Sequence, residues 1–205
     1  MTDHIIRDLA ALEALYGEVS EVSALKEITY LHPHYAAFIK ASPFAVLATS
    51  GPSGLDASPR GDPAGFIAIA DDKTLLVADR RGNNRIDSLR NILADPRVAL
   101  LFLVPGIGET LRVNGTAEIS VDPELLARFA VAGKAPRSML VVHIESVFFQ
   151  CSRALIRSEL WNPGKHISRS ALPSTGEILA AVTQDRIDGQ TYDRELPLRL
   201  KQTLY

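Results

Sequence analysis

The strongest constraint on the fold is a change in apolar period near residue 44. Before it, Leu9, Leu12 and Leu15 recur at helical spacing, and Gly17 ends that piece. From Phe44 onward, short apolar runs of strand type follow one another, separated by turns rich in glycine, proline and aspartate. The clear runs cover residues 44–49, 66–70, 74–78, 98–104, 110–120 and 139–149, and residues 55–58 are a candidate strand returning from the turn at 50–54.

Helical patterns lie between some of these strands. Residues 86–94 read as a helix that Asp95-Pro96 ends, and Asp122-Pro123 is a typical start for a helix through residue 130. About six strands with short connections favour an α+β, mainly β class: an antiparallel split barrel with peripheral helices. We expect a helical segment packed on the barrel (1–43), the barrel itself (44–160) and a C-terminal extension over the barrel or a partner (161–205).

Charge and cysteine content narrow the class of protein. The net charge of −2 argues against a dedicated nucleic-acid binder, which usually shows a basic excess. The single cysteine, Cys151, excludes an internal disulfide and fits a reducing compartment. No apolar run approaches the roughly 20 residues of a membrane span, and the first residues do not form a signal peptide. These features predict a cytoplasmic protein.

The segment Ala78-Asp79-Arg80-Arg81-Gly82-Asn83-Asn84-Arg85 joins an expected strand to an expected helix. Its arginine and asparagine side chains donate hydrogen bonds, and its glycine lets backbone donors come close, as around a phosphate. Seven of the 16 arginines lie between Arg60 and Arg112, against one lysine, and arginine suits bidentate phosphate recognition. The alternative is a solvated loop in which Asp79 and Asp87 pair with the arginines.

The energies indicate what kind of ligand such a loop could hold. Each charge-assisted hydrogen bond contributes roughly 1.5–3 kcal/mol net, so three give about 5–9 kcal/mol. Association itself costs an estimated 4–15 kcal/mol, so contacts to phosphate alone leave binding weak. A large planar ring on the ligand would supply the difference, which favours a phosphorylated cofactor over free phosphate.

Two other segments could contribute to the same site. Ser58-Pro59-Arg60-Gly61-Asp62 combines possible phosphate ligands with a glycine that allows close approach, although alone it is more often an ordinary turn. Alternation along 110–115 places Thr110, Arg112 and Asn114 on one strand face, which either lines a cleft or faces water. The scattered histidines do not indicate a metal site, and Gly106-Ile107-Gly108 lacks the rest of a dinucleotide fingerprint.

The order of these motifs resembles the pyridoxamine 5′-phosphate oxidase-like, FMN-binding split-barrel superfamily. The strand Asp95-Pro96-Arg97-Val98-Ala99-Leu100-Leu101-Phe102 and the later Arg112-Val113-Asn114-Gly115-Thr116-Ala117 are similar to its signature, and the resemblance covers roughly residues 44–161. The loop Ala78-Asp79-Arg80-Arg81-Gly82-Asn83-Asn84-Arg85 resembles that of a bacterial subgroup of probable FMN-dependent enzymes.

The resemblance implies FMN as cofactor, a homodimer with the flavin at the interface, and positions for the contacts. It places Arg60 at the start of the first FMN-binding segment, Asn84 and Arg85 near the phosphate, and a shorter Thr110 where the oxidase has a flavin-contacting glutamine. Residues 153, 157, 158 and 161 would reach the partner's flavin. The predicted cofactor-binding residues are Ser58, Arg60, Gly61, Asp62, Ala78, Asp79, Arg80, Arg81, Asn84, Arg85, Thr110, Arg112 and Trp161.

The chain also departs from the oxidase. The oxidase's C-terminal R-x-H motif for pyridoxine phosphate has no counterpart, since Arg169 and Arg194 lack the required neighbours. Vitamin B6 oxidation is therefore not implied. The sequence predicts an FMN-binding protein, an oxidoreductase of unknown substrate, acting on a small molecule and without catalytic residues that can be named. The alternatives are a non-catalytic flavin- or haem-binding protein and a deazaflavin-dependent reductase.

Overall fold

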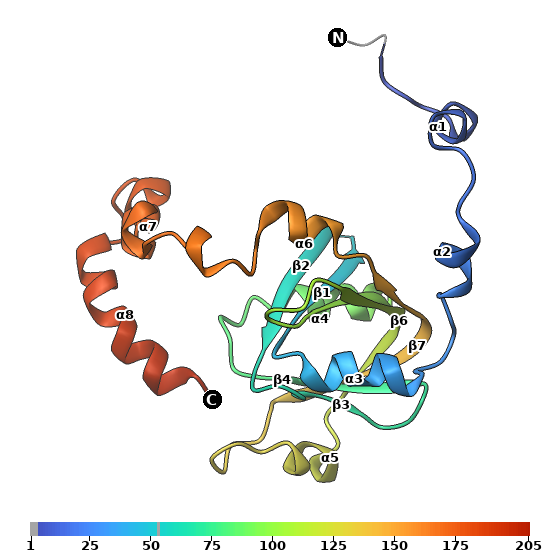
Figure 1. Ribbon diagram of the computed structural model, residues 1–205. Coiled ribbons are helices and arrows are strands. Elements are labelled where there is room, and N and C mark those ends of the chain that lie inside the picture. Colours follow the sequence, from blue (N-terminus) through green and yellow to red (C-terminus); the bar gives the residue numbers. More distant parts are fainter. Residues whose placement is uncertain (1–3, 53) are drawn as a thin grey trace.

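The computed structural model describes residues 4–52 and 54–205, and one seven-stranded sheet dominates it (Figure 1). Its strand order is β2-β1-β5-β6-β7-β4-β3, and every neighbouring pair is antiparallel. Ser53, in the predicted turn at 50–54, lies outside the described residues. The strands are β1 (Phe44–Gly51), β2 (Gly54–Gly61), β3 (Ile67–Ile69), β4 (Thr74–Asp79), β5 (Arg97–Leu103), β6 (Thr110–Ser120) and β7 (Ser138–Gln150).

The sheet curls into a half-barrel, which confirms the predicted split-barrel class with seven strands instead of about six. Side chains on the concave face alternate with outward ones, as the burial of every second residue in β1 and β5 shows. Phe102, Leu47 and Leu100 are essentially inaccessible to solvent and fill the centre of the core. The two edge strands of the sheet are β2 and β3.

Strands β6 and β7 form the longest ladder, and their register shifts between Asn114 and Gly115. The backbones come very close at this bulge, because a Cβ placed on Gly115 would lie 1.9 Å from the carbonyl oxygen of His143. Only glycine fits this position without moving the neighbouring strand.

Helices cover the open parts of the half-barrel. Helix α3 (Pro33–Ala41) has His32 as its N-cap and buries Ile39 against the sheet. Helix α4 (Asp87–Ala94) is amphipathic: it buries Ser88, Asn91 and Ile92 at spacings of three and four residues. Two more helices near the sheet are α5 (Pro123–Arg128) and α6 (Arg153–Ser158).

One buried asparagine fixes helix α4 on the β1–β2 hairpin. The Asn91 side chain donates to Thr49 Oγ1 at 3.1 Å and to the carbonyl oxygen of Gly54 at 3.3 Å. Gly51 leaves the space that the amide occupies, since a Cβ there would lie 2.3 Å from Asn91 Oδ1. The hydrogen bonds compensate the burial of the amide and hold the middle of α4 against the β1–β2 hairpin.

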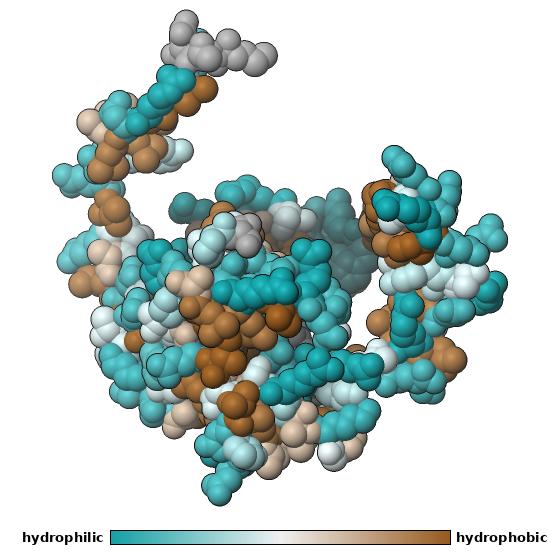
Figure 2. All heavy atoms as spheres, turned by 180° about the vertical axis from the view of Figure 1, so that it is seen from behind, coloured by the Kyte–Doolittle hydropathy of each residue, from teal (hydrophilic) through white to brown (hydrophobic). Residues whose placement is uncertain are grey.

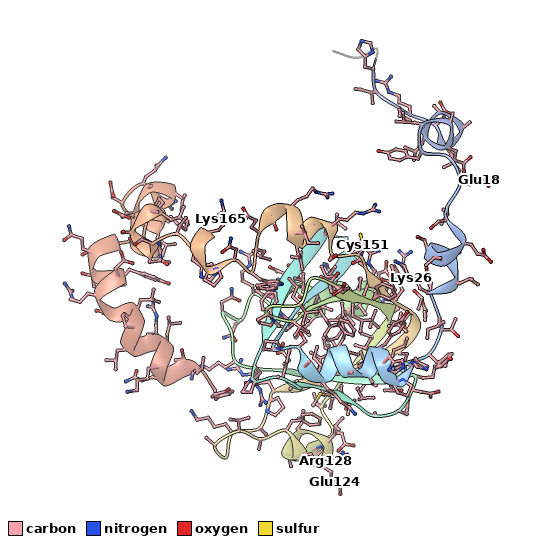
Figure 3. All side chains as sticks on the ribbon, in the orientation of Figure 1. Glu18, Lys26, Glu124, Arg128, Cys151 and Lys165 are labelled. Atoms are coloured by element: carbon pink, nitrogen blue, oxygen red, sulfur yellow. The ribbon has the colours of Figure 1, made fainter. Side chains whose placement is uncertain are left out.

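Two segments project from the barrel. Helices α1 (Leu9–Tyr16) and α2 (Glu21–Leu25) bury no residue, and Leu9 and Leu15 are about two-thirds exposed, at 66% and 67%. This segment meets the barrel near Lys26, whose Nζ lies 4.8 Å from the centre of the Phe149 ring, while Glu18 lies far out along it (Figure 3). Figure 2 shows apolar side chains on both projections.

The C-terminal projection is more helical than the sequence indicated. It contains α7 (Thr175–Thr183) and α8 (Gly189–Thr203), and α8 continues through Pro197, a residue that normally interrupts a helix. Asp188 caps α8 by accepting a hydrogen bond from the Thr191 amide at 3.1 Å. Among the described residues, no helix has the length and hydropathy that a membrane crossing requires.

Candidate functional site

A hollow of about 850 Å³ lies where the ends of β2 and β4 face each other across the split of the barrel. The two strands are far apart in the sheet order, and the curl of the sheet brings their ends together. The segments that line the hollow are residues 56–63, 78–89, 137–138 and 204–205, together with Pro43 and Phe66. Its charged side chains are five arginines and four aspartates.

Arg60, near the end of β2, is held in place by two serines. Its guanidinium donates to Ser58 Oγ at 2.6 Å and to Ser88 Oγ at 3.3 Å. Ser88 is buried in the first turn of α4, and its hydroxyl donates to Asp56 Oδ2 at 2.5 Å. This network fixes one cation in the hollow and joins β2 to the start of α4.

Asp79 ends β4 on the opposite wall. Burial raises the pKa of its carboxyl group, and the guanidinium groups of Arg60 and Arg137 oppose that rise. Its backbone carbonyl accepts a hydrogen bond from the Arg137 amide at 3.3 Å. Asp79 is thus a half-buried acid between two cations.

Arg80 has a structural contact and does not point freely into the hollow. Its Nε lies 3.1 Å from Asp62 Oδ2, and its Nη1 donates to the carbonyl oxygen of Phe129 at 2.8 Å. The Asp62 side chain is only 7% exposed, so this ion pair is well shielded from water. It bridges the residues that follow β2 and β4 and holds the two sides of the split together.

The rest of the arginine loop is more exposed. Arg81 has no acidic partner among the described residues, and Arg85 Nε lies 2.8 Å from Asp87 Oδ2. Asn84 and Ile86 adopt left-handed backbone conformations, with φ of 60° and 54°. Such φ values are rare for non-glycine residues, above all for β-branched ones, and strain of this kind concentrates at functional sites.

The structure gathers most of the predicted cofactor-binding residues. Ten of the 13 line the hollow: Ser58, Arg60, Gly61, Asp62, Ala78, Asp79, Arg80, Arg81, Asn84 and Arg85. Thr110, Arg112 and Trp161 do not. Thr110 donates to Gln150 Oε1 at 3.3 Å, the Arg112 guanidinium lies 5.3 Å from the centre of the Phe148 ring, and Trp161 donates to the carbonyl oxygen of Ile107 at 2.8 Å.

The hollow also contains polar residues outside the predicted set, among them Asp56, Ser88, Arg137 and Tyr205. Ser88 lies on an expected helix, and its burial gives no signal in a single sequence. Arg137 donates to Asn84 Oδ1 at 2.9 Å, so it also supports the loop. Tyr205 donates through its hydroxyl to Asp62 Oδ1 at 2.6 Å, a contact across 143 residues of sequence.

The described ranges 4–52 and 54–205 contain no cluster of three or more histidine, cysteine, aspartate or glutamate side chains placed to hold a metal ion. The chemistry available to the hollow is that of hydrogen-bond donors and cations around an anionic ligand.

Solved structures with a similar fold cover little more than half of this chain. HupZ of Group A Streptococcus is 23% identical over 60% of this chain and 95% of its own, with a TM-score of 0.49. General stress protein 26 of Bacillus anthracis is 17% identical over 56% and 88%, with a TM-score of 0.43. A related protein of the pyridoxinephosphate oxidase family from Clostridium acetobutylicum is 15% identical over 58% and 86%, with a TM-score of 0.45.

No curated protein matches the chain. The sequence family described as pyridoxamine 5′-phosphate oxidase matches residues 31–151, which run from just before α3 to just after β7. This match includes the whole sheet and nearly all of the hollow, so the chain belongs to the pyridoxamine 5′-phosphate oxidase family.

Proposed function

We propose that the chain binds FMN in the hollow between β2 and β4 and acts as a flavin-dependent oxidoreductase on a small molecule. The proposal rests on one observation: Arg60, Arg81, Arg85 and the first residues of α4 line the same hollow. Family membership supports the cofactor class, and the departures from the oxidase leave the substrate open.

The residues of the hollow fit the phosphate of such a cofactor. Arg60 is preorganised by Ser58 and Ser88, and Arg81 has no competing acid among the described residues. Helix α4 begins without a side-chain cap at Ile86, which leaves the amides of its first turn available to an anion. Gly82 adds no side chain that would block the approach of the ligand.

The volume of the hollow, about 850 Å³, falls within the range of sites that hold ligands of cofactor size. Phe66, Pro43 and Leu89 supply apolar wall for a planar ring. When bound, FMN would supply hydride and electron transfer, the chemistry that no side chain provides. The chain's own contribution would be to bind and orient the ring and to place cations near the charge of its reduced form.

Within this proposal the chain acts as a homodimer. Thr110, Arg112 and Trp161 lie outside the hollow of their own chain, and in a dimer they would face the flavin of the second copy. Trp161 is only partly exposed and its indole nitrogen is already paired with Ile107, so it would contribute apolar surface more than a hydrogen bond.

Reconstitution of the purified protein with FMN tests the proposal. We expect a yellow protein with flavin absorbance bands that survive gel filtration, at up to one FMN per chain. The measurement is an absorbance spectrum followed by denaturation and quantitation of the released flavin. A protein that stays colourless after incubation with excess FMN would exclude FMN as cofactor.

Anaerobic mixing of the FMN-loaded protein with NADH and with NADPH separates an enzyme from a flavin carrier. We expect the flavin bands to bleach with one of the two donors and to return when oxygen is admitted. Flavin that neither nicotinamide donor nor other physiological reductants bleach would instead favour the alternative, a non-catalytic binding protein.

Two arginines provide a matched pair for the phosphate contact. Arg85 and Arg97 each pair with an aspartate two residues away, and their side chains are 74% and 78% exposed, but only Arg85 lines the hollow. We expect Arg85→Ala to weaken FMN binding roughly tenfold, through the loss of a charge-assisted contact, and Arg97→Ala to leave it unchanged. Fluorescence titration of the apoproteins measures both. Equal effects would mean that Arg85 does not bind phosphate.

A further inference from the structure

Helix α8 returns from the C-terminal projection to the wall of the hollow. Helices α7 and α8 form a hairpin that stands away from the sheet, and the end of α8 points back toward the barrel (Figure 1). The two helices pack closely where Gly176 meets Gly189, and Asp193 accepts a hydrogen bond from the Gly176 amide at 2.7 Å. The hairpin is therefore a small unit of its own, and α8 buries no residue in the barrel.

The hydrogen bonds that join this hairpin to the rest of the described chain all involve Tyr205. Its hydroxyl donates to Asp62 Oδ1 at 2.6 Å, and its main-chain oxygen accepts from Lys134 Nζ at 2.9 Å. Arg80 lies over the tyrosine ring, 5.6 Å from its centre, and pairs with the other oxygen of Asp62. Tyr205 thus binds the same ion pair that bridges the two sides of the split.

We propose that the end of α8 is a strap over the cofactor hollow and that the Tyr205–Asp62 hydrogen bond is its latch, which must open before a ligand enters or leaves. The proposal rests on the proposed function, because the ligand in question is FMN. It adds a device outside the family match, which ends at residue 151.

The attachment is suited to opening. The attachment consists of one phenol hydroxyl, one exposed lysine and the contact of Arg80 with the tyrosine ring, and α8 has no buried residue, so release costs few contacts. Asp62 and Arg80 would keep their own ion pair after release, so the barrel itself would not have to unfold. Leu204 and Tyr205 line the hollow when the strap is closed, and the mouth widens when they leave.

A latch has a kinetic signature that a direct ligand contact lacks. If FMN passes only through the open state, the association and dissociation rate constants both scale with the open fraction, and their ratio does not change. A residue that merely contacts bound FMN would change the dissociation rate constant and the affinity instead.

Tyr205→Phe is the decisive variant, because it removes the hydroxyl and keeps the ring over Arg80. We expect both FMN rate constants to rise about tenfold, as for the loss of one hydrogen bond to a charged acceptor, with the dissociation constant unchanged within a factor of two. Stopped-flow flavin fluorescence measures association to the apoprotein, and displacement by excess competitor measures dissociation.

The matched control is Tyr192→Phe. Tyr192 lies on the same helix, where Arg199 stacks on its ring at 4.3 Å, and it does not line the hollow. We expect its rate constants to equal those of the unmodified chain. Unchanged rates in Tyr205→Phe, or a change in dissociation alone, would overturn the latch.

A second measurement tests the latch without flavin. Amide hydrogen exchange of residues 198–203 in the ligand-free protein should be faster in Tyr205→Phe than in Tyr192→Phe, because the end of α8 is released more often. Equal exchange in the two variants would overturn the latch. Failure of FMN to bind at all would overturn the proposed function instead, and would leave this exchange difference as the test of the strap.

Discussion

Replacing Gly115 by alanine is expected to cost the chain about 3 kcal/mol or more in free energy of unfolding. The added Cβ would lie 1.9 Å from the carbonyl oxygen of His143 and 2.9 Å from its carbonyl carbon, both backbone atoms of β7. Backbone in the middle of a ladder cannot move aside as the end of a flexible side chain can, so β6 and β7 would have to separate at the bulge. Urea denaturation followed by circular dichroism measures the loss.

Gly82→Ala is the control for this substitution. A Cβ at Gly82 meets no atom within 4 Å, and its φ lies outside the left-handed region. We expect its free energy of unfolding to change by less than about 0.5 kcal/mol. If the urea midpoint of Gly115→Ala equalled that of Gly82→Ala, the sheet would tolerate a wider bulge than the described backbone allows.

Arg60→Ala is expected to reduce FMN affinity about 100-fold, the largest effect among single substitutions in the hollow. Arg60 is partly buried and oriented by Ser58 and Ser88, so its contact with an anion would be preorganised and partly desolvated. Charge-assisted hydrogen bonds contribute about 1.5–3 kcal/mol each. The substitution also removes one of two cations beside the Asp79 carboxylate, which leaves that acid to repel an anionic ligand. Titration of apoprotein with FMN gives the affinity.

One further variant tests how much of the Arg60 effect is due to its charge, and another tests whether a second copy of the chain contributes to the site. Arg60→Lys keeps the charge but lacks the planar guanidinium that donates to both serines, and we expect an intermediate loss of affinity. Arg112 lies outside the hollow of its own chain, so Arg112→Ala lowers the affinity for FMN only if a second copy completes the site. An Arg60→Ala protein with full affinity and an unchanged thermal midpoint would remove Arg60 from the phosphate site.

The strands could be predicted from the sequence because burial on one face imposes alternation. In β6, residues 111, 113, 115 and 117 are buried and their neighbours are not, which is the pattern that the sequence shows. Helix α8 could not be predicted in the same way. It buries no residue and contains Pro197, so neither an apolar stripe nor local propensity indicates a helix. The helix is stabilised by its cap at Asp188 and by its packing on α7.

The candidate site was predicted where it is continuous in sequence and missed where the fold assembles it. Residues 58–62 and 78–85 are short polar segments at strand ends, which composition alone can indicate. Asp56 and Ser88 join the hollow through one hydrogen bond between β2 and α4. Tyr205 joins it from the far end of the chain. These contacts depend on how the sheet curls, which no local pattern records.

Pro59 gives the open edge of β2 a further property. The residue pairs with Val46 of β1 on one side, and β2 is an outer strand of the sheet. Proline has no amide hydrogen to donate to an additional strand, so a second chain cannot extend the sheet continuously along this edge. This edge of the barrel is thereby protected from edge-to-edge aggregation, and copies that associate here must do so through side chains.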